Sequence, residues 1–106
     1  MATTYKVLGQ LAPAATTNTD LYTVPSSTST VCSTLAICNR GTATTFRVAV
    51  RPANAAIDNL HYIIYDNYVN QYDTIFLTLG ITLATTDVIT VYAGTATLSF
   101  SLFGSG

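Results

Sequence analysis

Apolar and polar residues alternate along most of the chain, which is the period of a β-strand with one face toward a core. The longest such region is residues 29–52, where two arms flank a short segment containing Gly41. Each arm places three apolar residues on one face: Val31, Leu35 and Ile37, then Phe46, Val48 and Val50. We therefore predict a β-hairpin here that forms the central ladder of the fold.

Six further segments have strand composition: residues 3–10, 20–25, 61–69, 74–79, 87–92 and 96–103. The first is short and near the terminus, so we expect it at a sheet edge. The last two are separated by Ala93-Gly94-Thr95 and are predicted to form a second hairpin. Residues 53–60 lack alternation and are rich in turn formers, which indicates a loop with one helical turn, and the glycines of residues 104–106 are expected to stop the last strand.

About eight strands at roughly 8–12-residue spacing, with no segment of helical period, are typical of two packed sheets. We predict an all-β fold, an antiparallel β-sandwich of the immunoglobulin-like or jelly-roll-like kind with about four strands per sheet. At 106 residues the chain has the size of one domain, so residues 1–106 are expected to form a single β-sandwich domain.

Charge is scarce in this chain. Charged residues make up 8% of the sequence, whereas about a quarter is usual, and all five acidic residues are aspartates. The hydrophobic fraction is 49% and the mean hydropathy is +0.40. Because a soluble monomer normally keeps its neighbours apart with charge, this composition favours a component of an assembly. The alternative is a monomer kept soluble by its many hydroxyl groups.

The same numbers argue against two kinds of partner. Nucleic-acid binding needs a basic patch, whereas this chain has four Lys and Arg residues, a net charge of −1 and a pI near 5.4. Membrane spanning needs about twenty apolar residues in a row, and the runs here reach about five. Residues 1–6 do not resemble a signal peptide, so we expect neither secretion by that route nor membrane insertion.

The two cysteines, Cys32 and Cys38, are six residues apart in one predicted strand. Their even spacing predicts one shared face, with Cα atoms about 20 Å apart, too far for a disulfide. We expect free, half-buried thiols. A metal site would need further ligands, and the single histidine is distant in the sequence.

No residue pattern indicates catalysis with the spacing that a known mechanism needs. His61 beside Asp58 or Asp66 imitates a base and its orienting carboxylate, although a structural role at the start of a strand explains it better. Four oxygen-bearing residues resemble a loose calcium loop without its glycine and distal glutamate: Asp66, Asn67, Asn70 and Asp73. A turn is the better interpretation, so we expect no enzyme activity, no metal and no cofactor.

Tyrosines crowd one region of the sequence, at positions 62, 65, 68 and 72. Such a cluster suits a subunit interface or packing between sheets, and carbohydrate stacking is a third alternative. Arg47 and Arg51 lie on the face opposite Phe46 and would pair with Asp58 or Asp66 across a contact. The predicted interface residues are therefore Tyr62, Tyr65, Tyr68, Tyr72, Arg47 and Arg51.

Five segments carry a resemblance to known proteins. They are residues 5–10 (Tyr-Lys-Val-Leu-Gly-Gln), 20–25 (Asp-Leu-Tyr-Thr-Val-Pro), 31–40 running into Gly41 as Cys-Asn-Arg-Gly, 45–52 (Thr-Phe-Arg-Val-Ala-Val-Arg-Pro) and 86–92 (Thr-Asp-Val-Ile-Thr-Val-Tyr). In these segments the chain resembles small virion proteins of tailed bacteriophages, especially marine and cyanobacterial ones. The resemblance covers nearly the whole length, and it lies in structural motifs rather than in catalytic ones.

The resemblance implies a non-enzymatic structural protein of the virion, made and assembled in the host cytoplasm in many copies. We expect a repeated subunit of the tail, neck or fibre apparatus; the alternatives are a head (capsid) decoration or cement protein, and a carbohydrate-binding module. The expected partners are other copies of the chain, first of all in a trimer, and other phage structural proteins, with a host glycan as an alternative ligand. Nucleic acid and membrane are not expected partners.

Overall fold

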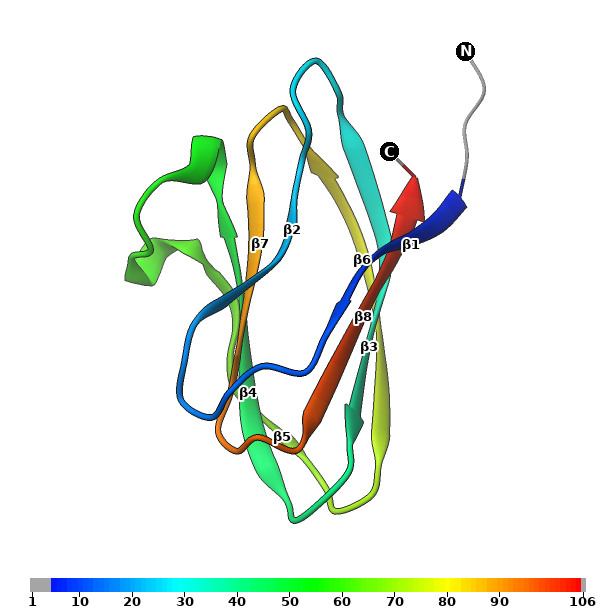
Figure 1. Ribbon diagram of the computed structural model, residues 1–106, viewed down its shortest axis with the longest axis vertical. Coiled ribbons are helices and arrows are strands. Elements are labelled where there is room, and N and C mark those ends of the chain that lie inside the picture. Colours follow the sequence, from blue (N-terminus) through cyan, green and yellow to red (C-terminus); the bar gives the residue numbers. More distant parts are fainter. Residues whose placement is uncertain (1–4, 106) are drawn as a thin grey trace.

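Eight antiparallel strands in two four-stranded sheets make up the computed structural model, which describes residues 5–105 (Figure 1). The strands are β1 (Tyr5–Leu11), β2 (Thr19–Thr23), β3 (Thr30–Asn39), β4 (Thr44–Arg51), β5 (Tyr62–Val69), β6 (Thr74–Leu83), β7 (Val88–Ala93) and β8 (Leu98–Ser105). One sheet has the order β1-β8-β3-β6 and the other has the order β2-β7-β4-β5. The predicted β-sandwich is confirmed, with β1 at an edge as expected; residues 1–4 and 106 of the predicted domain lie outside the described residues.

The strand order is that of a jelly roll. The chain folds back on itself at the β4–β5 connection, so that β4 pairs with β5, β3 with β6, β2 with β7 and β1 with β8. Two further ladders, β3 with β8 and β4 with β7, join these pairs into the two sheets. Of the two sandwich types predicted, the jelly-roll-like one has this arrangement.

Both predicted hairpins are wrong. β3 and β4 belong to different sheets, and so do β7 and β8. Alternation determines which side chains face the core, but it does not determine which strand lies next to which. Residues 40–43, which connect β3 to β4, can reach about 13 Å when extended, enough to cross the roughly 10 Å between two packed sheets. A connection as short as a hairpin loop therefore also serves to change sheets.

The core lies between the sheets and is lined by alternate residues of the inner strands. Phe46 of β4 and Phe100 of β8 meet across it edge to face, with ring centroids 6.2 Å apart. Both rings are completely buried. Among the other fully buried large side chains are Leu35, Ile37, Val48, Val69, Ile89, Leu98 and Leu102. Most of these positions follow the sequence pattern, because a strand buries every second residue.

A β-bulge in β3 changes which of its residues face the core. The pairing of β3 with both neighbours shifts between Cys32 and Thr34, so the alternation changes phase there. Val31 is therefore 46% exposed rather than sharing a face with Leu35, and Cys32 is buried while Cys38 is exposed. The prediction that the cysteines share a face is wrong for this reason. Both are free thiols, and burial raises the pKa of Cys32 to about 11.

Glycines accommodate the same bulge. Gly80 of β6 has a φ of +62°, a conformation that favours glycine, and lies where β6 shifts register against β3. As a result β6 continues to Leu83, past the predicted end at residue 79. Gly104 of β8 packs so closely on β3 that a Cβ atom there would lie 2.0 Å from the carbonyl oxygen of Val31.

Asn39, at the end of β3, ties three loops together at one end of the sandwich. Its side chain is buried and donates to the carbonyl oxygens of Thr42 (2.8 Å) and Asn70 (3.1 Å). Its Oδ1 accepts from the backbone N–H of Gly41 (3.0 Å) and from the hydroxyl of Thr97 (2.9 Å). These bonds join the β3–β4, β5–β6 and β7–β8 connections, so this asparagine holds the sheet crossings in place.

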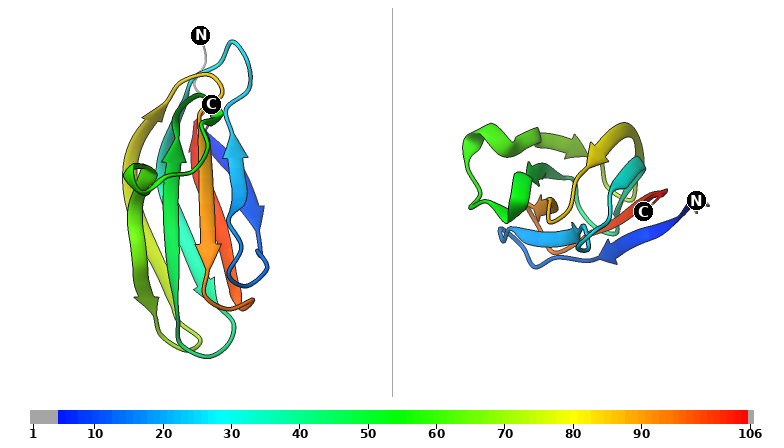
Figure 2. Two further views of the ribbon diagram at one scale, coloured as in Figure 1. Left: turned by 90° about the vertical axis from the view of Figure 1, so that its left-hand side faces the viewer. Right: turned by 90° about the horizontal axis from the view of Figure 1, so that it is seen from above.

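The β4–β5 connection carries two 3₁₀ turns, η1 (Pro52–Asn54) and η2 (Asn59–His61), where one helical turn was predicted. It projects from the outer side of the sheet that contains β4 and β5 (Figures 1 and 2). No helix within residues 5–105 is long and apolar enough to cross a membrane.

Two outer sheet faces as the candidate functional site

The outer face of the sheet β2-β7-β4-β5 carries most of the predicted site residues, and the left view of Figure 2 looks onto it. We call it the tyrosine–arginine face and define it by Asp20, Arg47, Arg51, Tyr62, Tyr65, Thr90 and Tyr92. Arg47 and Arg51 lie on the outer face of β4. Their partners in β7 are Tyr92 and Val88, which lie on the same face. Ile89 and Val91 alternate with these partners and point into the core. The sequence pattern predicted this orientation of the two arginines.

Arg47 is enclosed by groups of its own chain. Its guanidinium lies 4.2 Å from the ring centroids of both Tyr65 and Tyr92, so it is stacked between two aromatic rings. It also donates to both carboxylate oxygens of Asp66, at 2.6 and 3.3 Å. The hydrogen bond with Asp66 raises the pKa of Arg47. The predicted pairing with Asp66 is present, but within one chain rather than across a contact.

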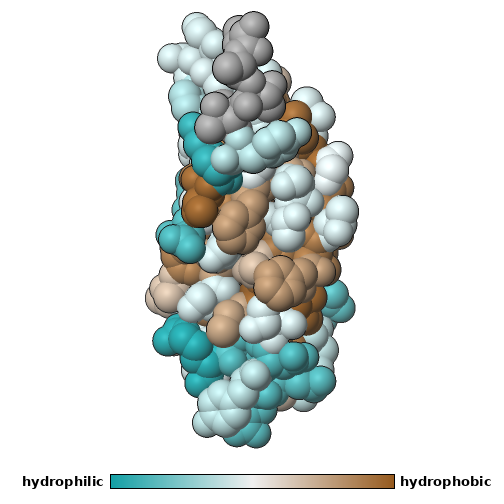
Figure 3. All heavy atoms as spheres, turned by 90° about the vertical axis from the view of Figure 1, so that its right-hand side faces the viewer, coloured by the Kyte–Doolittle hydropathy of each residue, from teal (hydrophilic) through white to brown (hydrophobic). Residues whose placement is uncertain are grey.

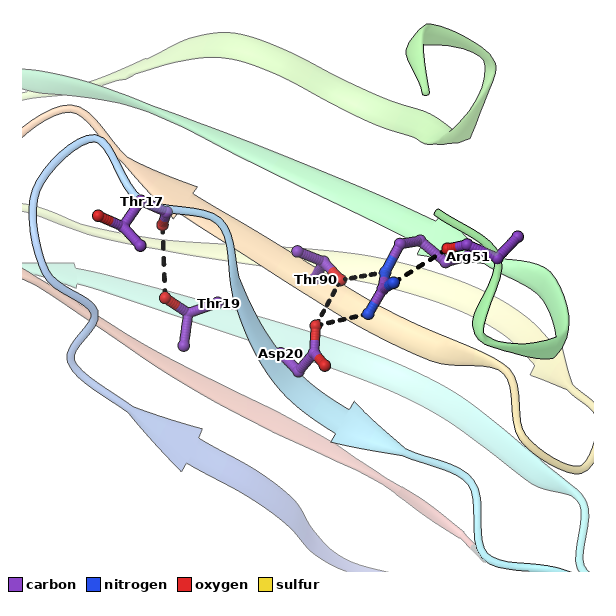
Figure 4. A network of polar contacts seen from close by, with 6 residues as sticks. Thr17, Thr19, Asp20, Arg51 and Thr90 are labelled. Atoms are coloured by element: carbon purple, nitrogen blue, oxygen red, sulfur yellow. Dashed lines mark hydrogen bonds and ion pairs between the residues drawn. The ribbon is translucent and has the colours of Figure 1, made fainter. Parts of the chain in front are cut away.

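Arg51 is held in a second network, which joins β4, β7 and β2 (Figure 4). Its guanidinium donates to Asp20 Oδ1 at 2.7 Å and to Thr90 Oγ1 at 2.9 Å. Thr90 in turn donates to Asp20 at 3.0 Å, and Arg51 also donates to the carbonyl oxygen of Ala55 at 2.9 Å. The acid that pairs with Arg51 is therefore Asp20 and not Asp58 or Asp66. This network fastens the β4–β5 connection to the sheet.

β5 does not keep the alternation that its sequence suggests. Its pairing with β4 shifts register twice, between the partners of Phe46 and Val48 and again beside Ala49, and Asp66 has a φ of +51°. Strict alternation would place Tyr62 and Tyr65 on opposite faces, but in the structure they are neighbours, with ring centroids 5.0 Å apart and planes at 84°. β5 is an edge strand, where such bulges are common.

The other two predicted interface tyrosines lie farther along the chain. Tyr68 is 60% exposed near the end of β5, and Tyr72 is 73% exposed in the β5–β6 turn. The turn itself is confirmed, because the backbone N–H of Asp73 donates to the carbonyl oxygen of Asn70 at 3.2 Å. The structure thus brings Tyr62, Tyr65 and Arg47 together and leaves Tyr68 and Tyr72 outside that cluster.

An open pocket of about 470 Å³ lies beside the clustered tyrosines and is lined by Asn59, Tyr62 and Tyr65. Asn59 opens η2, whose geometry is fixed by a capping box. The Asp58 carboxylate accepts from the backbone N–H of Asn59 at 2.7 Å, and His61 Nδ1 accepts from the backbone N–H of Asp58 at 3.0 Å. His61 therefore ends η2 as a structural cap, and β5 begins at Tyr62.

Two of the four oxygen-bearing residues that resemble a loose calcium loop have other bonding partners. The Asp66 carboxylate binds Arg47, and Asp73 Oδ1 accepts from the backbone N–H of Thr74 at 2.9 Å. Over residues 5–105, no group of three or more His, Cys, Asp or Glu side chains is arranged to hold a metal ion.

The outer face of the other sheet, β1-β8-β3-β6, is uncharged across all four strands. Residues opposite one another in an antiparallel ladder share a face, so the register gives this surface row by row. The rows are Tyr5–Ser105–Val31–Thr82, Val7–Phe103–Thr34–Thr78, Gln10–Ser101–Ala36–Phe76 and Ser99–Cys38–Thr74. We call these fifteen residues the neutral face. None of them is Asp, Lys or Arg, although aromatic and aliphatic groups are exposed among the hydroxyls.

Exposure on the neutral face is high for apolar side chains. Tyr5 is 76% exposed, Phe76 is 70% exposed, and Val7 and Val31 are about half exposed. Figure 3 shows this side of the molecule, with apolar and hydroxyl residues across the middle and hydrophilic ones mainly at the margins. Exposed apolar groups gathered over a sheet in this way mark an interaction surface.

Sequence reasoning missed this face and two residues beside the tyrosine cluster, of which Asn59 lines the pocket. Asn59 and Tyr92 come next to the tyrosine cluster only through the β4–β5 connection and the β4–β7 pairing. The neutral face requires the strand order, because its rows combine β1, β8, β3 and β6. One signal available in the sequence was the alternation of Thr74, Phe76 and Thr78, which gives a strand an uncharged outer side.

Compared with known proteins, the chain matches no family model, no curated protein and no solved structure. The geometry of the two outer faces is therefore the basis for assigning a function to the protein.

Proposed function

We propose that the protein is a non-enzymatic structural subunit of a tailed-bacteriophage virion, a homo-oligomer repeated in the tail, neck or fibre apparatus. The neutral face is the observation that carries this proposal, and its occupant is other copies of the same chain. The five segments that resemble phage virion proteins correspond largely to β1, β2, β3, β4 and β7, so the resemblance concerns the strands of the sandwich. Jelly rolls also form viral capsid domains, although a fold alone does not define a function.

The size of the neutral face is sufficient for a specific contact. Four strands about 4.8 Å apart and four rows about 6.8 Å apart give a plan area of about 500 Å². Covering this face on two copies would bury about 1,000 Å² in total, which is near the minimum for a specific interface. Because none of its residues is charged, burial avoids the large cost of desolvating ions. Hydroxyl groups of facing copies can hydrogen-bond to one another.

A trimer fits the same dimensions. Three sheets about 19 Å wide, set as the sides of a triangle, would lie about 5.5 Å from the threefold axis. That distance is close to half of the roughly 10 Å that separates packed sheets, so the side chains of the three neutral faces would fill the centre. Closed rotational symmetry would leave none of these faces exposed.

This proposal moves the interface away from the residues predicted by sequence. Arg47, Arg51 and Tyr65 form bonds or stacking contacts within the chain, and breaking these to bind a partner would cost stability. Tyr68 and Tyr72 stay exposed, and a surface that contains them is the competing interface.

The position in the virion is tested by labelling intact particles with an antibody against the protein and locating the label by electron microscopy. Label at the tail, neck or fibres is the expected result, and the other structural proteins at that position are then its partners. Label spread over the head would instead select the alternative function, a capsid decoration or cement protein. A protein absent from purified particles would refute the proposal.

A further inference from the structure

We propose that the pocket formed by Asn59, Tyr62 and Tyr65 binds a neutral pyranose sugar, such as an exposed unit of a glycan. This assigns a site to the carbohydrate alternative and does not depend on the virion proposal. The volume of about 470 Å³ lies in the usual range of small-molecule sites. The pocket is on the tyrosine–arginine face, so it stays accessible if the neutral face is covered by other copies.

The aromatic walls of the pocket are held in place before any ligand binds. Tyr65 is fixed from one side by the Arg47 guanidinium at 4.2 Å, and Arg47 is fixed by Asp66 and by Tyr92. Tyr62 packs edge to face on Tyr65. Tyr65 nevertheless remains 57% exposed, so its ring keeps free surface for a ligand. Preorganised rings reduce the entropy lost on binding.

The wall that carries Asn59 is also fixed. The capping box of Asp58 and His61 sets η2, and Arg51 binds the carbonyl oxygen of Ala55. At the start of the β4–β5 connection, the Asp87 carboxylate accepts from the backbone N–H of Ala53 at 2.9 Å. The same carboxylate also accepts from the backbone N–H of Ala84, which follows β6, at 2.9 Å. The connection is therefore bonded at its start, middle and end. The amide of Asn59 supplies both a donor and an acceptor beside the rings.

The charges near the pocket favour a neutral ligand. A cation finds no carboxylate on the three lining residues, and Arg47 already covers one side of the Tyr65 ring. An anion finds no positive charge on the three lining residues, and the Arg47 guanidinium is already paired with the Asp66 carboxylate. A pyranose has an apolar C–H surface for a tyrosine ring and hydroxyls for an amide and the phenolic groups. This combination matches the lining.

The proposal is tested by NMR titration of the full chain with neutral methyl glycosides of glucose, galactose, mannose and N-acetylglucosamine. Glucuronate and glucosamine serve as the anionic and cationic probes. We expect at least one neutral glycoside to shift signals of Asn59, Tyr62 and Tyr65, with a Kd on the order of 1 mM. The absence of pocket shifts with every neutral glycoside at about 20 mM, or tighter binding of a charged probe, would overturn it.

Two variants and a matched control locate the site. Tyr65→Ala and Asn59→Ala should each weaken binding about tenfold or more, the first by removing the stacking surface and the second by removing the amide. Tyr68→Ala, an exposed tyrosine of the same strand outside the pocket lining, should leave the Kd unchanged. Equal losses for all three variants would contradict the assignment. Asn59→Ala leaves both tyrosines in place and keeps the test valid if Tyr65→Ala disturbs the fold.

Discussion

Replacing Phe76 by Thr tests the proposed interface at the neutral face. Phe76 is the most exposed aromatic residue in the two inner rows of this face. A Phe side chain can bury about 200 Å², and 70% of Phe76 is exposed, so association can cover about 140 Å² of it. At about 25 cal/mol per Å² this contributes about 3.5 kcal/mol per subunit. The methyl group of Thr retains part of this burial, which leaves a loss of about 2 kcal/mol per subunit, or a factor of about 30 in the association constant for each subunit in the oligomer.

The same substitution should affect the fold much less. Only about 60 Å² of the ring is buried within the subunit, and Thr suits a strand that already carries Thr74 and Thr78 on this side. The expected loss of unfolding free energy is about 1 kcal/mol, which lowers the Tm of the isolated subunit by about 4–8 °C. Sedimentation equilibrium over a concentration series gives the association constant, and thermal unfolding monitored by circular dichroism gives the Tm.

Tyr68→Thr is the matched control, because Tyr68 is about as exposed as Phe76 but belongs to the surface predicted from sequence. We expect it to leave the association constant unchanged. If Tyr68→Thr dissociates the oligomer and Phe76→Thr does not, the interface is at the tyrosines and our placement on the neutral face is wrong.

Three further predictions concern the fold. Gly104→Ala should lower the free energy of unfolding in urea by about 3 kcal/mol, because its Cβ would collide with the backbone of Val31; an unchanged midpoint would refute the close packing of β8 on β3. Asn39→Ala should lower the free energy of unfolding by about 3 kcal/mol in the same assay, because it leaves several buried partners without a hydrogen bond. A loss below about 0.5 kcal/mol would contradict the role of Asn39 in joining the three connections. With a thiol reagent at pH 8, native subunits diluted until they dissociate should be labelled quickly at Cys38 only, because burial raises the pKa of Cys32 to about 11 and shields it, and denaturant should expose both; equal labelling of the native subunits would contradict the β3 bulge.

Much of the sandwich could be predicted from alternation, because burial of every second residue is a local property of a strand. Leu35, Ile37, Phe46 and Val48 were placed on the apolar faces of their strands in this way, and all four are buried. The order of the strands could not be predicted, since the short connections of a jelly roll cross between sheets and resemble hairpin loops. The position of β1 at the edge of its sheet was predictable, because the first segment is short and near the terminus.

The candidate sites depend on features that the local pattern does not contain. The bulges in β3 and β5 change the phase of alternation, so Val31 turns outward and Tyr62 comes next to Tyr65. The pairing of Arg51 with Asp20 needs β2 and β4 on either side of β7. Sequence could therefore indicate tyrosines and arginines as site residues, but it could not show which of them meet.

The central claim, that copies of this chain associate through the neutral face, is tested most directly by the solution mass of the purified protein. Light scattering on a size-exclusion column should give about 34 kDa, three times the 11.2 kDa subunit. A mass of twice the subunit would keep the association but replace the trimer with a face-to-face dimer. A mass of 11.2 kDa at every concentration would contradict the claim, because the exposed face would then remain in contact with water.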